Sequence, residues 1–393
     1  MSKIEKIDAG VCVAEGFFAD GIAAGLKGEG ALDVAFIHSK SVCEVASVFT
    51  TNKMAAAPLR HAQGVVKSDF ILINAKNANA MTGAAGLEDI KEILAAIKLK
   101  HPHLSNPLMS STGVIGVRLP KKQIVEAALR FDLDTKNDAA ASEAIMTTDR
   151  FSKRIAYRIT LDDGSRFHIG AMAKGAGMIN PAMATMLCFI TTDAAISRET
   201  MQPILERVNK TTFNAASVDG DTSTNDTVFI FANGESGVCD TALFEEALHL
   251  ITEHLAKELV RDGEGATKLV TYDISGAKSD REAEIAAKAL SNSLLIKTAL
   301  YGEDPNWGRI AMSIGACGVT CKESTLRIAY DDVVLYDNGV NLFNETVEAR
   351  AAEVMKKSEF TIYCDLGVGT GRFRAFGCDL GYEYVQINAD YRT

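Results

Sequence analysis

The sequence predicts an α/β fold, more specifically a layered α+β sandwich followed by a smaller α+β domain. Strand-like apolar runs at 33–37 and 70–73 alternate with a helical stripe of apolar residues at 87–97. The chain has 393 residues, 47% of them hydrophobic, which is more apolar material than one small domain can bury. Together these observations favour two closely packed units of mixed secondary structure.

A β-hairpin is expected over 154–172. Its two alternating segments flank the turn sequence 162–165, where Gly164 can adopt the positive φ that a tight turn demands. The hairpin therefore leads directly into the segment before Thr185, a residue that is considered below as a candidate nucleophile.

The second half of the chain begins with long helices and ends in a smaller mixed unit. A long helix is predicted at 243–259, and Ser279 with Glu282 forms the capping box of another. A domain boundary there would separate a catalytic α/β domain, 1–276, from a C-terminal α+β domain, 277–393. The predicted elements of the smaller domain are a helix at 307–314, a strand pair at 326–336, a helix at 345–356, and strands containing Ile362 and Val385.

Composition and charge exclude several classes of protein. The 51 acidic residues exceed the 41 basic ones, and a formal net charge of -10 argues against a nucleic-acid partner. No apolar stretch of signal-peptide or membrane-span length is found, so we expect a cytoplasmic protein without membrane contact. The 8 cysteines form no Cys-x-x-Cys pair and have no histidine at ligand spacing, which predicts reduced thiols and no metal site.

Two loops resemble binding motifs without matching them. The acidic run 219–225 alternates like an EF-hand loop, but Thr224 replaces the glycine and Ile230 the glutamate that such a loop needs. The glycine-rich stretch 367–371 fits neither nucleotide-binding pattern, because Arg372 stands where the last glycine belongs. We therefore expect no calcium site in the first loop and a turn between strands in the second.

The segment around Thr185 carries the most specific signal, and it reads KGAGMINPAMATML over 174–187. A threonine hydroxyl next to a small residue can attack the preceding carbonyl, pass through an ester and release a new N-terminus. The freed α-amine has a reference pKa near ~7.7–8.0 and can accept the hydroxyl proton, so nucleophile and base share one residue. By composition alone, 182–190 also fits an ordinary buried strand.

The 174–187 segment resembles the signature of ornithine acetyltransferase, the glutamate N-acetyltransferase of arginine biosynthesis. Other stretches resemble the same family in the same order along the chain. They are 110–116, 146–149, 218–227, 261–268, 302–310 and 388–393. The likeness spans nearly the whole chain and implies a fold like that of self-cleaving aminopeptidases and ornithine acetyltransferases.

The resemblance implies self-cleavage between Ala184 and Thr185, with Thr185 as the nucleophile. The products would be an α chain, 1–184, and a β chain, 185–393. Thr112 and Gly113 would form the oxyanion hole, since a hydroxyl and an open backbone N–H can stabilise a tetrahedral oxyanion. The substrate contacts that carry over are Thr148, Lys174, Thr185, Glu264, Asn388 and Thr393.

The implied reaction is a ping-pong exchange without a cofactor. N-acetylornithine would acylate Thr185, ornithine would leave, and glutamate would accept the acetyl group. The resemblance also implies a heterotetramer of two α and two β chains, while the use of acetyl-CoA as a second donor stays open. Two alternatives stay open as well: a self-cleaving aminopeptidase or amidase in which water is the acceptor, and a nucleotide-binding or structural protein in which Thr185 belongs to the core.

Overall fold

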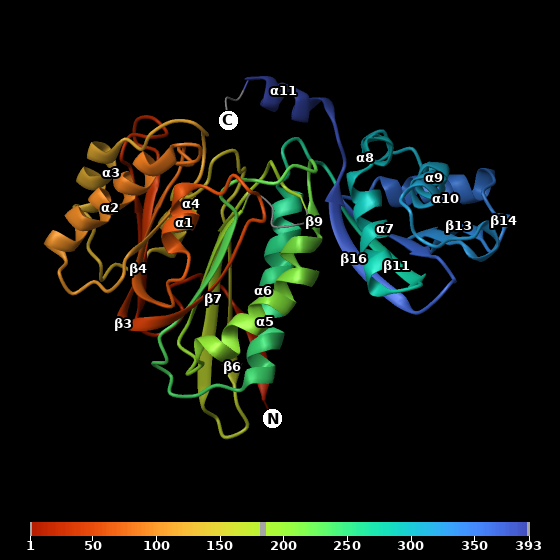
Figure 1. Ribbon diagram of the computed structural model, residues 1–393. Coiled ribbons are helices and arrows are strands. Elements are labelled where there is room, and N and C mark those ends of the chain that lie inside the picture. The colour runs from red at the N-terminus through yellow and green to blue at the C-terminus, as the bar shows by residue number, and fades with distance from the viewer. Residues whose placement is uncertain (1, 181–185, 391–393) are drawn as a thin grey trace.

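The computed structural model describes residues 2–180 and 186–390 (Figure 1). Ala184, Thr185 and Thr393, which are named above as site residues, lie outside the described residues. The strands of the larger sheet are β1 (Lys3–Ile7), β2 (Phe17–Ile22), β3 (Val34–Phe49), β4 (Lys67–Asn74), β5 (Leu108–Ser111), β6 (Lys153–Thr160), β7 (Arg166–Lys174), β8 (Leu187–Thr192) and β10 (Thr227–Ala232). They follow the order β1-β6-β7-β8-β10-β3-β4-β5, with β2 paired to β3.

The larger sheet folds on itself, so that two of its layers pack face to face. Apolar side chains of β3 and β4 share one core with those of β7, β8 and β10. In that core the rings of Phe189 and Phe229 stack with their centroids 6.3 Å apart. Since side chains alternate along a strand, Cys188 and Ile190 of β8 point to the opposite face. Both faces of β8 are therefore buried, which explains the uninterrupted apolar run in its sequence.

Helices cover the two outer faces of this folded sheet (Figure 1). The helices of the larger unit are α1 (Ala57–Ala62), α2 (Gly83–Lys100), α3 (Lys121–Ala128), α4 (Asp138–Ala144), α5 (Arg198–Thr211) and α6 (Thr241–Arg261). Helices α2 and α3 pack on β2, β3 and β4, and helices α5 and α6 pack on β6, β7 and β8. The predicted layered sandwich is confirmed, with α2, α3, α5 and α6 outside the sheet layers, while Ala141 and Ala144 of α4 join the core between them.

The predicted hairpin is confirmed as β6 and β7, paired from Lys153↔Ala173 to Thr160↔Arg166. Its turn closes as predicted, with Gly164 at a φ of 84°. Strand β7 then pairs antiparallel with β8, and Lys174 lies opposite Leu187. The hairpin thus brings the end of β7 beside the first residue of β8.

The smaller unit has its own sheet and its own core. Its strands are β9 (Ala216–Ser217), β11 (Leu269–Ala277), β12 (Arg327–Tyr330), β13 (Val333–Asp337), β14 (Val340–Asn341), β15 (Glu359–Asp365) and β16 (Gly371–Cys378). Its helices are α7 (Asp280–Asn292), α8 (Leu294–Tyr301), α9 (Trp307–Ala316), α10 (Glu345–Met355) and α11 (Tyr382–Asp390), and short 3-10 turns lie at Phe213–Ala215 and Glu323–Thr325. Strand β11 lies almost entirely before the predicted boundary at 276/277, yet it pairs with β15 and β16 in this sheet. The division of the chain into domains therefore stays a prediction.

The predictions for the smaller unit are largely confirmed, with one correction. The predicted helices match α9 and α10, and the strand with Ile362 is β15. The predicted strand around Val385 is wrong, because the chain forms the helix α11 there. A strand needs a neighbour for its backbone hydrogen bonds, whereas a helix forms them internally, and α11 buries none of its residues. Only half of the capping box forms: Ser279 accepts the Glu282 N–H, but the Glu282 carboxylate accepts the Thr320 N–H.

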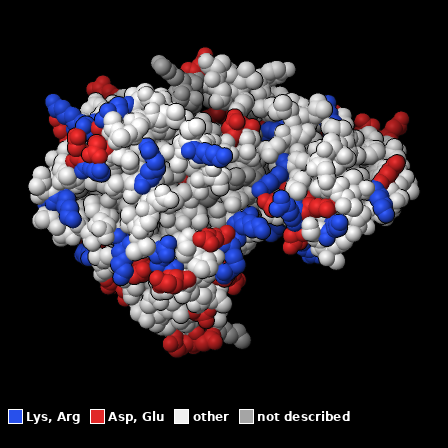
Figure 2. Space-filling view, viewed as in Figure 1, with Lys and Arg blue, Asp and Glu red and all other residues white. Residues whose placement is uncertain are grey.

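Figure 2 shows Lys and Arg interspersed with Asp and Glu over the visible face of the molecule. A hollow separates the larger unit from the smaller one on this face.

Among the described helices, none is both long enough and apolar enough to cross a membrane.

Candidate active site

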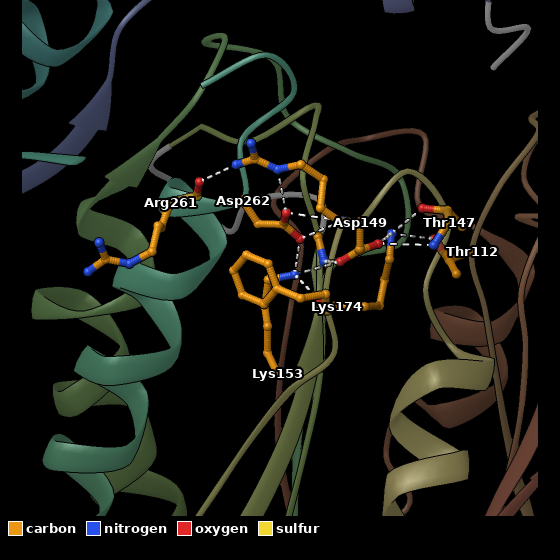
Figure 3. Close-up of polar contacts among 10 residues, drawn as sticks. Thr112, Thr147, Asp149, Lys153, Lys174, Arg261 and Asp262 are labelled. Atoms are coloured by element: carbon orange, nitrogen blue, oxygen red, sulfur yellow. Dashed lines mark hydrogen bonds and ion pairs between the residues drawn. The ribbon is translucent and has the colours of Figure 1, made fainter. Parts of the chain in front are cut away.

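A buried ammonium group lies at the end of β7. The Nζ atom of Lys174 donates hydrogen bonds to Thr147 Oγ1 at 2.7 Å and to Thr112 Oγ1 at 3.3 Å (Figure 3). Its side chain is only 3% exposed, and Asp149 Oδ2 lies 3.8 Å from the same Nζ. The structure thus brings Lys174 and Thr112, both predicted as site residues, into contact. Thr148, predicted as a substrate contact, is half-buried, and its neighbour Thr147 is the residue that contacts Lys174.

The contact between Lys174 and Thr112 fixes the direction of the threonine hydroxyl. An ammonium group is a donor only, so Thr112 Oγ1 must act as the acceptor in this hydrogen bond. Its own hydrogen is then available to donate to another acceptor. The Thr112 hydroxyl is therefore set up as a donor beside a positive charge, which suits the stabilisation of an anion.

Gly113 occupies a position that only glycine can fill. Its φ is 132°, and an added Cβ would lie 2.2 Å from the carbonyl carbon of Lys76. The loop is held on both sides of it, since Thr112 N–H donates to Asn74 O at 3.0 Å and Val114 N–H donates to Lys76 O at 3.1 Å. The absence of a side chain lets the two backbone segments approach each other.

A buried ion network lies behind Lys174. The side chain of Lys153 is 0% exposed and donates to Asp149 Oδ1 at 2.9 Å and also to Asp262 (Figure 3). Arg150 adds further bonds, with Nε donating to Asp262 Oδ1 at 3.1 Å and Nη2 to the carbonyl of Arg261. The network therefore ties the loop after α4 to the end of α6.

The charges in this network shift the pKa values of its members. Burial lowers the pKa of Lys174, while the nearby Asp149 carboxylate opposes that shift by favouring the ammonium form. Burial also disfavours ionisation of Asp149, but Lys174, Lys153 and two backbone N–H groups outweigh it and hold the pKa of Asp149 below its usual range. Asp149 is therefore the ionised counter-charge of Lys174. By contrast, burial raises the pKa of the Cys188 thiol in β8, which makes it a poor nucleophile.

A second polar pair involves Glu264 and Asn388, both predicted as substrate contacts. Asn388 Nδ2 donates to Glu264 Oε2 at 2.8 Å, although the two residues are far apart in sequence. Gly177 gives the carboxylate its space, because a Cβ there would lie 2.6 Å from the Glu264 carboxylate oxygens. The Glu264 charge also acts on Lys174 and favours its ammonium form. The structure therefore links this pair to the Lys174 cluster.

Several residues that hold the site together were not predicted from the sequence as site residues. Asn225 Nδ2 donates to Ser111 O at 2.8 Å and to Ala78 O at 2.7 Å, so it fixes the end of β5, one residue before Thr112. Asn225 belongs to 218–227, a stretch that was noted above for its resemblance to the family. Its density of Asp, Asn and Thr just before the buried strand β10 is a signal that could have indicated a role in the site. Lys153 was also missed, and Asp149 and Asp262 lie in the stretches 146–149 and 261–268 without having been named as site residues.

The acidic run 219–225, considered above as a calcium loop, uses a carboxylate to bind the backbone. Asp219 accepts the N–H groups of Met178 and Ile179 at 2.6 and 2.9 Å. Within the described residues, no group of three or more His, Cys, Asp or Glu is arranged to hold a metal.

Hydroxyl groups around a buried ammonium suit the stabilisation of an oxyanion such as the one that forms in acyl transfer. The chain belongs to the ArgJ family, whose model matches residues 18–393. It is 59% identical over 396 residues to the arginine biosynthesis bifunctional protein ArgJ of Wolinella succinogenes, with 100% of both chains covered. It is 42% identical over 407 residues to the glutamate N-acetyltransferase of Methanocaldococcus jannaschii, with 98% of this chain and 99% of the relative covered. The chain is thus an acyltransferase of arginine biosynthesis.

Among solved structures, the chain is similar to ornithine acetyltransferase complexed with ornithine from Mycobacterium tuberculosis. The sequence identity is 30% and the TM-score is 0.40, over 48% of this chain and 100% of that chain.

Proposed function

We propose that this chain transfers an acetyl group from N-acetylornithine to glutamate through an acetyl ester on Thr185. Thr185 would become N-terminal when the Ala184–Thr185 bond is cut. The observation that best supports the proposal is the place of the Lys174–Thr112 pair. Lys174 lies opposite Leu187, so the pair lies beside the start of the strand that follows Thr185 in the sequence. Family membership supports the choice of substrates.

The proposed chemistry uses few groups. The α-amine of Thr185 accepts the proton of its own hydroxyl, and the oxygen attacks the acetyl carbonyl. The oxyanion that forms would accept hydrogen bonds from the Thr112 hydroxyl and the Gly113 N–H, each worth roughly 3–4 kcal/mol. Collapse of this intermediate releases ornithine, whose nitrogen takes up the proton from the α-amine. The amine of glutamate then attacks the ester by the same route and restores the free hydroxyl.

The charges of the site suit an amino-acid substrate. The Lys174 ammonium can bind the α-carboxylate that ornithine and glutamate share. Glu264 and Asn388 would contact the amino groups, with Thr148 and Thr393 as further contacts. Because Asp149 already balances part of the Lys174 charge, a bound carboxylate would bring the cluster closer to neutrality.

The strand order supports continued association of the two fragments after cleavage. Strand β7 belongs to 1–184 and β8 to 185–393, and they pair from Ile169↔Thr192 to Lys174↔Leu187. Strand β10, also of the second fragment, pairs with β3 of the first. Both fragments also contribute to the two larger hydrophobic cores of the sandwich. We propose the heterotetramer of two α and two β chains, and acetyl-CoA as a further donor, from the family alone.

The test is Thr185→Ala, followed by denaturing mass spectrometry and an acetyl-transfer assay. We expect one uncleaved chain with no transfer, while the wild type gives two fragments and full transfer. Thr241→Ala, at an exposed threonine that begins α6, is the matched control and should behave as wild type. Cleavage and turnover in Thr185→Ala would overturn the proposal. Loss of the acetyl group from N-acetylornithine at equal rates with and without glutamate would identify an amidase instead.

A further inference from the structure

The segment 218–227 supplies no reacting group to the proposed transfer reaction, yet it contacts residues before and after the proposed cleavage point. On the upstream side, the Asp219 carboxylate accepts the N–H groups of Met178 and Ile179 at 2.6 and 2.9 Å. The Val218 N–H also donates to Ile179 O at 2.8 Å. The chain is therefore anchored shortly before Ala184.

On the downstream side, the anchor is Asp226. Its Oδ1 accepts the Met186 N–H at 3.1 Å, and the N–H of Thr227 donates to Met186 O at 3.0 Å. Met186 is joined to Thr185 by one peptide bond. The Asp226 carboxyl group is therefore bonded to the residue that directly follows the proposed nucleophile in the sequence.

The carboxyl group of Asp226 differs from the others that bind backbone in this molecule. Its residue is 0% exposed, and its Oδ2 makes no hydrogen bond to any residue that the structure describes. Burial raises the pKa of Asp226 well above its usual range, although the Met186 N–H and the Lys174 charge favour the ionised form. An oxygen that lacks a partner in so buried a place is costly unless it carries a proton or has a task.

We propose that Asp226 is the positioning acid of self-cleavage: Oδ1 holds Met186 in place, and Oδ2 supplies the proton that the departing nitrogen needs. This inference rests on the proposed self-cleavage. The Thr185 oxygen attacks the Ala184 carbonyl carbon, and the C–N bond breaks. The nitrogen gains the proton of Asp226, and Asp226 regains one from the threonine hydroxyl. Water then hydrolyses the resulting ester, leaving the Ala184 carboxylate and the free Thr185 hydroxyl.

The test separates the acceptor role from the acid role. Asp226→Asn keeps an oxygen that can accept the Met186 N–H but removes the acidic proton, whereas Asp226→Ala removes both. Cleavage of freshly synthesised full-length chain is followed over time by denaturing mass spectrometry, with the melting temperature recorded for each variant. We expect the Asp226→Asn cleavage rate to fall at least 100-fold, a size typical of lost acid–base catalysis, with little change in melting temperature.

Asp193 provides a matched control at the other end of β8. It is 2% exposed and accepts the N–H groups of Glu15 and His168. Asp193→Asn should cleave at the wild-type rate. Wild-type cleavage in Asp226→Asn would overturn the acid role while leaving the proposed function intact, and a wild type that never cleaves would overturn both.

A second measurement does not depend on the folding of any variant. Transfer of a proton during C–N cleavage predicts slower cleavage of the wild-type chain in deuterium oxide, by about twofold or more. Equal rates in the two solvents would contradict the proposal.

Discussion

The two polar clusters of the candidate site are built in opposite ways. The cluster around Lys174 is sealed, with the side chains of Lys153 and Asp149 both 0% exposed. The Glu264–Asn388 pair relies on α11, a helix that buries none of its residues and extends away from the body of the smaller unit (Figure 1). One end of the site is therefore fixed by the core, whereas the other depends on a helix with few supporting contacts.

This difference suits the proposed pair of substrates. Ornithine and glutamate share the carboxylate and α-amine of an amino acid, but their side chains carry opposite charges. A buried, fully paired cluster can recognise the shared part with fixed geometry. The Glu264–Asn388 pair, which depends on a helix without a buried face, can adjust to the amino groups, whose number differs between ornithine and glutamate. We therefore expect substitutions in the Lys174 cluster to have large effects and those on α11 to have small ones.

The largest effect should follow from Asp149→Asn, which removes the negative charge beside the buried ammonium groups of Lys153 and Lys174. Breaking a buried ion pair in this way costs about 3–5 kcal/mol of the free energy of unfolding. Urea denaturation of the variant and the wild type measures the difference. Glu245→Gln, which breaks an exposed ion pair with Arg207, is the control and should change nothing measurable.

The difference in stability between the wild type and Asp149→Asn should depend on pH. The folded-state pKa of Asp149 lies below its value in the unfolded chain, so its contribution is complete above the unfolded value of about 3.8. The contribution is lost as the pH falls through the folded-state pKa. The stability gap between wild type and Asp149→Asn should therefore narrow in acid, and a constant gap would mean that the ion cluster is not its source.

Gly113→Ala should have the next largest effect. The new Cβ would lie 2.2 Å from a backbone carbon and would occupy a φ of 132° that side chains rarely adopt. Displacement of the loop would remove a donor from the oxyanion hole, so kcat should fall about 10²–10³-fold. Gly315→Ala in α9 is the control, since nothing lies within 4 Å of its Cβ position and its φ is outside the left-handed region. Equal activity of the two variants would show that the loop has no part in catalysis.

The charge of Lys174 should set the alkaline limit of activity. Because burial lowers the pKa of this lysine, kcat/KM should decline at a pH below the ordinary lysine value of 10.5. Lys174→Arg should move that decline to higher pH, since a guanidinium stays charged above pH 12, even if its activity is lower throughout. Lys122→Arg, at a side chain that is 88% exposed, should leave the profile unchanged.

The smallest effect is expected for Asn388→Ala on α11. It removes one exposed hydrogen bond to Glu264, worth about 0.5–1.5 kcal/mol, so kcat/KM should fall about two- to tenfold. Asn338→Ala, at an exposed turn before β14, serves as the control. A loss as large as that of Gly113→Ala would contradict the contrast between the two clusters.

Local signals predicted much of the fold and part of the site. The hairpin around Gly164, the helices α2 and α6 and the glycine turn before β16 all follow from periodicity and turn chemistry within short stretches. The Thr112–Gly113 loop and Lys174 were found through motifs that are continuous in sequence. The helix α11 was missed because the spacing of its apolar residues fits no clear helical period, and only the absence of a neighbouring strand decides between helix and strand.

The sequence by itself determined most types of element, although not α11, together with their order and the residues available for acyl transfer. Only the tertiary structure decided which charges meet. Lys153 and Asp262 are 109 positions apart, and Asn225 reaches Ser111 across 114 positions. Such contacts arise because folding the sheet into two layers buries these groups, and a buried charge or amide is stable only beside a partner that the fold supplies.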